Sequence, residues 1–278
     1  MQTRNLLSLA YLTVNGADPV DHLEAAAAGG FDAAGLRIVP LSHLNIDYGV
    51  IGNRERIREI NRARERTGVK VFDIEVFTLS ENTDVAKLSP ALETSAELGA
   101  SSVQAVSEDA DAARAAATFA ALCDAAAGFG LSVSLEFMRF RTLRTLDDAL
   151  ALLDAAGRPN SGVLIDALHL ARSGGNAAAV AAIPSNRIAY MQLCDAPREA
   201  PPLDGLAHEA RNERRMPGEG GLPLEDLLDA LPDNVAISVE VPRSSDVGRS
   251  ARERATLAGD ATRAWLARYR TRRESARS

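Results

Sequence analysis

The strongest constraint on the fold is a repeated alternation of two apolar patterns along the chain. Short runs typical of buried strands alternate with longer, alanine-rich amphipathic stretches, which indicates βα units around a parallel sheet. Eight such units fit the 278 residues, since a (β/α)8 barrel typically needs ~250 residues. The expected strands are Leu6–Leu12, Ala34–Val39, Val69–Phe77, Ser102–Val106, Ser132–Phe137, Gly162–Ala167, Ile188–Cys194 and Ala236–Val241.

Several of the helices expected between these strands end in glycine, as helix C-termini commonly do. The expected helices include Pro19–Ala28, Asn53–Arg66, Ala86–Leu98, Ala110–Ala127 and Leu146–Ala155. A doubly wound open sheet gives a similar alternation, but the Gly-rich phosphate loop that usually follows its first strand is missing from the sequence. We therefore expect one α/β domain, a TIM barrel over residues 1–267. Residues 268–278 contain five arginines and no core pattern, and we expect a frayed basic tail there.

Composition and charge narrow the choice of partners and location. The chain is 46% hydrophobic and 25% charged, as in ordinary globular proteins, which argues against disorder and membrane spanning. Its net charge of −7 opposes binding to nucleic acid. The N-terminal run Met1–Val14 fits a first strand better than a secretory signal. Two cysteines, Cys123 and Cys194, are too few for a disulfide framework, so we expect the reducing cytoplasm. A homo-oligomer remains compatible with the sequence.

Polar side chains stand at the C-terminal ends of the last four expected strands. They are Glu136 in SVSLEF, Asp166 in GVLIDALH, Gln192 in IAYMQLCD and Glu240 in AISVEVP. In a barrel these strand ends meet at the mouth where active sites are built, so the four side chains are expected to converge. Three carboxylates held together without a cation would repel one another or stay partly protonated. The pattern therefore predicts one divalent cation, and oxygen-rich ligands suit Mn²⁺, Mg²⁺ or Co²⁺.

This arrangement resembles the xylose isomerase-like barrel superfamily, which contains sugar phosphate isomerases and epimerases. The resemblance covers nearly the whole chain. It implies metal ligands of the types Glu, Asp, His and Glu on strands five to eight, and this chain departs from that set at Gln192. The amide oxygen of Gln192 can still bind a cation, but it is neutral and cannot titrate. The segments IDALH, QLCDAP and RNERRMPGEG are also similar to bacterial 3-dehydroshikimate dehydratases, some of which have Gln at this position.

The resemblance also implies residues that face the substrate. His169, three residues after Asp166, matches a substrate-facing histidine and is a candidate acid or base. Arg214 matches an arginine that reaches over the site from the long loop after strand seven, although the adjacent Arg211 and Arg215 leave the register open. That loop, from Asp195 to Leu222, is long enough to cover the site.

Weaker candidates come from the strand phase alone. Arg37 and Glu75, near the ends of strands two and three, face the same mouth and are expected to contact substrate. Asp195 is expected to orient Arg214 or a metal ligand. His22 is expected on a helix surface, and the loop residues His43 and His208 receive no role.

The chemistry implied by this arrangement is removal of a proton from carbon next to a carbonyl, with the metal stabilising an enediolate. Glu136 and Glu240 would exchange protons on opposite faces of a small polyhydroxylated keto substrate, which gives an isomerase or epimerase. Loss of a neighbouring hydroxyl would instead give a 3-dehydroshikimate dehydratase-like lyase that forms protocatechuate.

Two other functions are compatible with a barrel of this kind. A noncatalytic sugar-binding barrel would not need the four metal ligands. A DNA-cleaving barrel of the abasic-site type needs a histidine-rich metal cluster and a basic surface, and only four histidines occur here.

Overall fold

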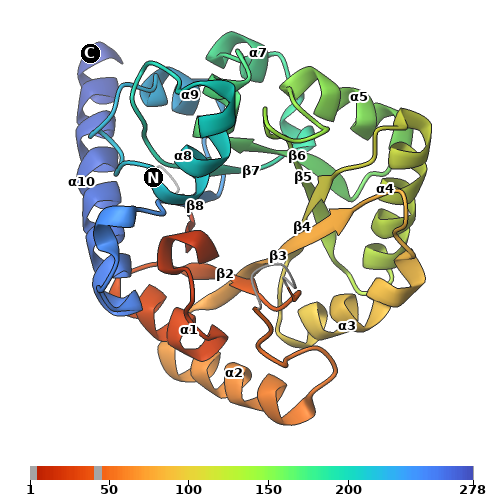
Figure 1. The fold of residues 1–278 in the computed structure, drawn as a ribbon. Helices are drawn as coiled ribbons and strands as arrows, with labels where there is room; N and C mark the ends of the chain where they lie inside the picture. Colours follow the sequence, from red (N-terminus) through yellow and green to blue (C-terminus); the bar gives the residue numbers. More distant parts are fainter. Residues whose placement is uncertain (1–4, 41–45, 278) are drawn as a thin grey trace.

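The computed structural model describes residues 5–40 and 46–277 and contains a closed barrel of eight parallel strands (Figure 1). Each strand pairs with its neighbour in sequence, and β8 closes the barrel against β1. The fold class expected from the sequence is confirmed, and every expected strand overlaps an observed one. The strands are β1 (Leu7–Leu9), β2 (Ala33–Arg37), β3 (Lys70–Leu79), β4 (Ser102–Ser107), β5 (Ser132–Glu136), β6 (Ser161–Asp166), β7 (Ile188–Leu193) and β8 (Ile237–Val239).

The larger helices lie around the outside of the barrel (Figure 1). Gly157 ends α5 in the left-handed conformation, as expected for a glycine at a helix C-terminus, and Thr145 and Asp148 form a capping box at the start of α5. The helices are α1 (Pro19–Ala28), α2 (Arg54–Thr67), α3 (Ser89–Glu97), α4 (Ala112–Ala127), α5 (Leu146–Ala156), α6 (Ala167–Arg172), α7 (Ala177–Ala181), α8 (Leu206–Asn212), α9 (Leu224–Ala230) and α10 (Ala251–Arg277).

The barrel interior is unusually polar. Side chains alternate along a strand, so Asp73 shares a face with Glu75, and Tyr190 shares a face with Gln192. The Tyr190 hydroxyl donates to Asp73 Oδ2 at 2.5 Å across this interior. Gly35 on β2 leaves room for these groups, because a Cβ there would lie 2.4 Å from Asp73 Oδ1 and 2.8 Å from Glu75 Oε1. The apolar core therefore lies between the strands and the outer helices, with the interior left to polar side chains.

The expectation of a frayed tail is wrong for residues 268–277, because α10 continues to Arg277. Tyr269 is buried, stacks on Trp265 and donates its hydroxyl to Asp229 at 2.6 Å. Arg273 forms ion pairs with Asp229 and Asp233 at 3.2 and 3.1 Å. Arginines that suggest a solvated tail in the sequence thus pair with acidic residues on and after α9.

The expectation that His22 lies on the surface is also wrong. Its side chain is buried, with the residue only 1% exposed, and Nε2 lies 3.0 Å from the carbonyl oxygen of Leu9 on β1. The stretch Ala86–Leu98 is not one helix, since a 3-10 turn over Val85–Leu88 precedes α3. His43 lies outside the described residues.

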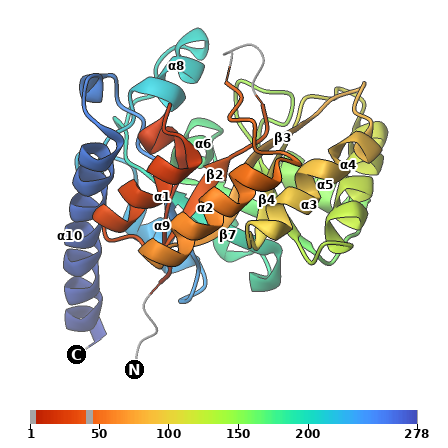
Figure 2. The same cartoon turned by 90° about the horizontal axis from the view of Figure 1, so that it is seen from below.

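The connection between β7 and β8 contains α8 and lies at the carboxyl end of the barrel. Figure 2 shows α8 at the opposite end of the molecule from both chain termini. The long loop is therefore placed over the strand ends on which the candidate site residues stand.

None of the helices formed by the described residues is long and apolar enough to span a membrane.

Candidate metal and substrate site

The four expected ligand residues stand side by side at the mouth of the barrel. Glu136 ends β5 and Asp166 ends β6, while Gln192 lies on β7 directly beside Asp166 in the sheet register. Glu240 follows the last residue of β8, and all four residues are buried. Parallel strands end at one edge of the sheet, which is why polar residues spread over 105 positions of sequence meet here.

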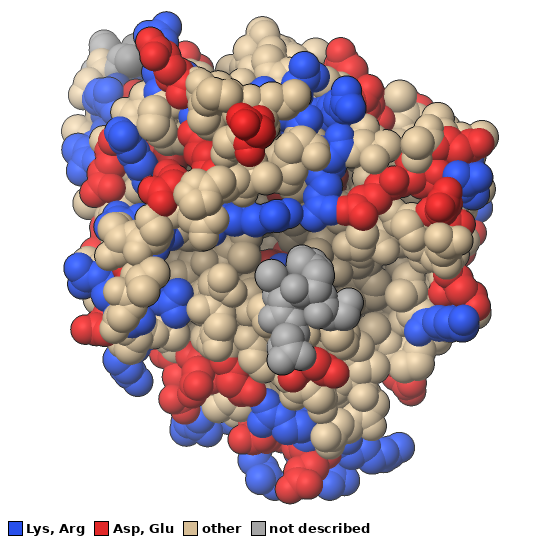
Figure 3. Space-filling model, viewed as in Figure 1, with Lys and Arg blue, Asp and Glu red and all other residues tan. Residues whose placement is uncertain are grey.

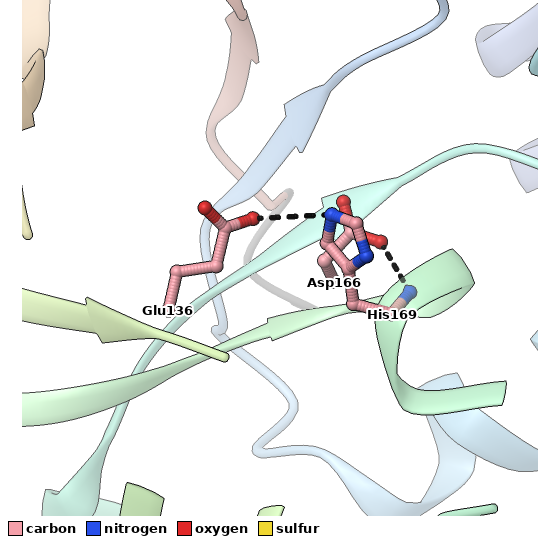
Figure 4. A group of neighbouring side chains, drawn as sticks. All are labelled: Glu136, Asp166 and His169. Carbon is pink, nitrogen blue, oxygen red and sulfur yellow. Dashed lines mark hydrogen bonds and ion pairs between the residues drawn. The ribbon is translucent and has the colours of Figure 1, made fainter. Parts of the chain in front are cut away.

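Glu136, Asp166 and His169 form the tightest group of candidate ligands (Figure 4). One ligand atom from each of the three lies within 4.8 Å of the other two. Asp166 caps the start of α6 by accepting a 2.9 Å hydrogen bond from the His169 amide, which turns the His169 ring toward Glu136. The distance from His169 Nε2 to Glu136 Oε1 is 3.7 Å. The short helix after β6 therefore places an imidazole among the carboxylates.

Arg214 joins Asp166 to Glu240. Its Nη1 lies 2.5 Å from Asp166 Oδ2 and its Nη2 lies 2.7 Å from Glu240 Oε2. Its Nε donates to the Ala210 carbonyl at 2.8 Å, which fixes the guanidinium as a buried bridge. Arg211 and Arg215 have exposed side chains, so Arg214 is the arginine of this loop that points inward. The loop arginine expected to contact substrate thus contacts two of the expected ligands in this structure.

Gln192 has an oxygen available for a ligand. Its Nε2 donates to Glu240 Oε1 at 3.3 Å, whereas its buried Oε1 has no hydrogen-bond partner among the described residues. A buried acceptor without a partner is costly unless a donor or a cation occupies the adjacent space. The amide is oriented with its oxygen free, as a ligand role requires.

The charges of this site also fit a divalent cation. The guanidinium of Arg214 offsets one of the three carboxylates Glu136, Asp166 and Glu240 when all are ionised. The remaining charge of two negatives matches one divalent ion, and carboxylate and amide oxygens are suitable ligands for such ions. The residues present therefore fit the group that the sequence predicts.

Burial dominates the protonation of these groups. Burial, with Glu240 and Asp166 nearby, raises the pKa of Glu136 well above its usual range. Burial likewise raises the pKa of Glu240 to about 8. Burial also opposes ionisation of Asp166, but Arg214 and His169 hold its pKa below the usual value. Burial lowers the pKa of His169 to about 4, so its ring is neutral near pH 7.

The other side of the mouth holds Arg37 and Glu75. The Arg37 Nη2 lies 3.5 Å from Glu75 Oε2, and the guanidinium stands 5.0 Å from the centre of the Tyr11 ring. Glu75 Oε1 accepts a 3.0 Å hydrogen bond from the Tyr11 amide. Burial, together with Asp73, raises the pKa of Glu75 to about 7. The structure places both residues at the mouth but pairs them with each other.

Asp195 has a different contact set from the one expected. Its carboxylate accepts hydrogen bonds from the amides of Ala196, Gly218, Gly220 and Leu222, at 2.8 to 3.1 Å. It contacts neither Arg214 nor an expected ligand through its side chain. Asp195 instead holds the long loop folded back on itself, and its backbone pairs with that of Arg215, the residue after Arg214.

Sequence reasoning missed Gln104 and Phe140. Gln104 on β4 donates to Glu136 Oε2 at 2.7 Å and so holds this carboxylate in place. Phe140 packs edge-on against His169, with ring centres 5.7 Å apart. Gln104 could have been found as a polar residue in an apolar strand, two positions before the strand's expected end. Nothing in the local pattern around Phe140 indicates its contact with His169.

The fold and the site together define a class of protein: a closed (β/α)8 barrel with a carboxylate-rich mouth over its last four strands. The chain belongs to the xylose isomerase-like TIM barrel family, whose family model matches residues 23–269.

Two curated relatives and one solved structure illustrate the similarity. The 3-dehydroshikimate dehydratase of Pseudomonas aeruginosa PAO1 is 30% identical over 253 residues, which are 86% of this chain and 37% of that protein. The inosose isomerase of Bacillus velezensis is 29% identical over 153 residues, 53% of each chain. The chain therefore spans about a third to a half of these relatives. A crystal structure of IolI protein with a bound zinc atom superposes with a TM-score of 0.79 at 19% identity, covering 95% of this chain and 98% of that one. That likeness shows the fold.

Proposed function

We propose that this chain is a divalent-metal-dependent isomerase or epimerase that removes a proton from carbon next to the carbonyl of a small polyhydroxylated keto substrate. The observation that carries the proposal is the buried group of three carboxylates offset by one guanidinium. Glu136, Asp166 and Glu240 exceed the charge of Arg214 by two when ionised, and such an excess inside a protein requires a cation or bound protons.

Glu136, Asp166, Gln192 and Glu240 are the proposed ligands, and the free Oε1 of Gln192 supports its inclusion. His169 lies close enough to Glu136 and Asp166 to offer a nitrogen in addition. The zinc atom bound to IolI supports a divalent ion in a barrel of the same fold. When bound, the cation would polarise the substrate carbonyl and stabilise the negative charge that develops on its oxygen.

The proton-transfer groups are proposed to be Glu136 and Glu240. They stand at the two ends of the run from β5 to β8, with Asp166 and Gln192 between them, so they approach a substrate from different sides. Burial raises the pKa of both groups in the metal-free protein, and a bound cation would favour the ionised forms that can accept a proton. His169 is neutral near pH 7 and is proposed to accept a hydrogen bond or a proton from a substrate hydroxyl.

Dehydration is the second candidate, and a specific observation favours it. The match to the Pseudomonas dehydratase extends over 86% of this chain, whereas the match to the inosose isomerase covers 53%. The same first step would serve both reactions: a carboxylate removes the proton next to the carbonyl. In the dehydratase the carbon–oxygen bond of a neighbouring hydroxyl then breaks, and the hydroxyl leaves as water after receiving a proton from a site residue.

One experiment separates these reactions. The protein is loaded with Mn²⁺ and incubated in deuterated water with 3-dehydroshikimate, with inosose and with a panel of ketoses. Proton NMR measures deuterium incorporation at carbon, and ultraviolet absorbance measures formation of an aromatic product. An Asp166→Asn variant is the matched control, because it removes one charge from the site and keeps the shape of the side chain.

Deuterium incorporation with formation of an isomer supports the isomerase, and appearance of protocatechuate supports the dehydratase. Binding of these compounds with neither exchange nor product would instead indicate a noncatalytic sugar-binding barrel. A protein that binds no divalent ion under any of these conditions would contradict the metal-dependent proposal itself.

A further inference from the structure

A row of side chains leads from the candidate metal site to the edge of the mouth. His169 Nε2 lies 3.7 Å from Glu136 Oε1, and the His169 ring packs edge-on against Phe140 with centres 5.7 Å apart. The guanidinium of Arg211 stands 5.8 Å from the centre of the Phe140 ring. The rings of His169 and Phe140, which are in contact, thus separate Arg211 from Glu136. One small substrate can span this separation.

Among residues 5–40 and 46–277, Arg211 has no anionic partner, unlike three other arginines at the mouth. Arg37 pairs with Glu75, Arg172 with Glu209, and Arg214 with Asp166 and Glu240. Within residues 5–40 and 46–277, no carboxylate lies within ion-pair distance of Arg211, and its side chain is exposed beside Phe140. An unpaired guanidinium held over an aromatic ring keeps its donors directed outward for a ligand.

Arg141 brings a second positive charge to the same place. It follows Phe140 in sequence, and Arg211 is near enough for its charge to add to burial, the main cause, in lowering the pKa of Arg141. Arg141 forms an ion pair with Glu108, but its buried Nε has no hydrogen-bond partner among the described residues. Glu108 pairs with Arg141 only, so the two guanidinium groups are accompanied by a single carboxylate. Figure 3 shows Lys and Arg side chains gathered along one edge of the central hollow.

We propose that Arg141 and Arg211 bind an anionic group on the substrate, a carboxylate or a phosphate, while the keto end of the same molecule lies against Glu136 and His169. The inference rests on the proposed function and adds the substrate class: a polyhydroxylated keto acid or keto phosphate rather than a neutral sugar. Guanidinium groups bind carboxylate and phosphate through paired charge-assisted hydrogen bonds, and an anion here would balance the excess positive charge.

The test compares ligands that differ only in the anion. Shikimate carries a carboxylate on a hydroxylated ring, and methyl shikimate is its uncharged ester; myo-inositol 1-phosphate and myo-inositol form the corresponding phosphate pair. Isothermal titration calorimetry measures the Kd of each for the wild-type protein, for Arg211→Gln and for Arg139→Gln. Arg139 is the matched control, since it lies in the same loop as Arg141 with an exposed side chain.

We expect the wild-type protein to bind at least one anionic ligand more tightly than its neutral partner, and Arg211→Gln to weaken that binding by about 10–100-fold, as loss of a charge-assisted hydrogen bond does. Arg139→Gln should leave it unchanged. Preference for shikimate assigns a carboxylate, and preference for the inositol phosphate assigns a phosphate. The inference would be overturned if, in both pairs, the anionic and the neutral ligand bound equally well or did not bind at all. It would also be overturned if Arg211→Gln bound the anionic ligand as tightly as the wild-type protein does.

The anion preference is measured again on Asp166→Asn, which tests the proposed metal site separately. If that variant loses metal but keeps the preference for anions, both proposals stand. If the wild-type protein shows the anion preference but binds no divalent ion, the proposed function fails and the anion site remains. If metal binding and turnover are found without any anion preference, only the substrate class fails.

Discussion

The two halves of the barrel mouth hold similar residue types but differ in charge balance. On the side of β1 to β4, Arg37 pairs with the carboxylate of Glu75, and Tyr11 contacts both. On the side of β5 to β8, Arg214 faces a group of three carboxylates and contacts two of them. When all of these groups are ionised, the pair in the first half has no net charge, whereas the group in the second half keeps an excess of two negative charges. The difference locates the proposed cation-binding function in the second half and leaves the first half to shape the pocket.

The largest expected difference is in metal content. Asp166→Asn should remove most bound Mn²⁺ and most turnover, because it deletes a charged ligand and the partner of Arg214. Glu75→Gln in the other half should keep metal, since Glu75 is paired within its own side of the mouth. Metal analysis after equilibrium dialysis checks both variants. An Asp166→Asn variant with full metal content would remove Asp166 from the proposed ligands and with it the contrast between the halves.

The second prediction concerns proton transfer within the charged half. His169→Ala should lower turnover by ~10²–10⁴-fold, the usual contribution of a positioned proton-transfer group, while metal content stays near wild type. Steady-state kinetics with metal analysis makes the measurement, and His208→Ala is the control because His208 is exposed. Loss of metal together with activity would make His169 a ligand, and a near wild-type rate would make it structural.

The third prediction tests the role of Arg214 in balancing charge. Arg214→Gln should cost about 3–5 kcal/mol of the unfolding free energy of the metal-free protein, as removal of one partner from a buried ion pair does. Added Mn²⁺ should restore part of that loss, because a cation can neutralise the carboxylates that the guanidinium leaves behind. Urea unfolding with and without metal measures the effect. The same small loss in Arg214→Gln and in the exposed Arg215→Gln would show that Arg214 does not stabilise the site.

The smallest effect is expected beneath the neutral half, where the His22 ring lies 6.3 Å from that of Tyr11. Burial lowers the pKa of His22 from 6.5 to about 4. The unfolded chain therefore binds a proton at a higher pH than the folded protein does. His22 costs no stability above pH 6.5, and about 3 kcal/mol is lost as the pH falls to about 4.

Urea unfolding between pH 7 and pH 4 measures this loss. His22→Gln should flatten the decline, because glutamine can donate to the Leu9 carbonyl but does not titrate. His208→Gln is the exposed control. An identical pH dependence in wild type and His22→Gln would show that the folded protein accommodates the charged ring.

The sequence is sufficient to predict the barrel and the second half of the mouth, because strand period and strand ends are local properties. Glu136, Asp166, Gln192 and Glu240 can be found in this way, and the structure places all four at the mouth. The direction of Arg214 could not be found locally. Arg214 lies in a loop whose fold brings together distant residues, since Asp195 accepts hydrogen bonds from the Gly218 and Gly220 amides more than twenty residues away.

The other errors have the same origin. His22 looks like a helix surface residue until its acceptor, the Leu9 carbonyl on β1, is known. Arg273 looks solvated until Asp229 and Asp233 are placed beside α10. In each case the neighbours in sequence suggest an exposed polar residue, while the partner is supplied by another element. Apolar periodicity predicts where the core lies, but it carries no information on such pairings.

The closure of β8 onto β1 imposes an order on folding. Thr13 donates to the Val239 carbonyl across 226 residues of sequence, and Leu7 stands beside Ile237 in the same closing ladder. During synthesis, β1 emerges long before β8 and keeps one unpaired edge until almost the whole barrel is made. Glu240 arrives with that last strand. The proposed metal site is therefore completed by the same event that closes the barrel, so that a chain interrupted before β8 would have both an open sheet edge and an incomplete set of ligands.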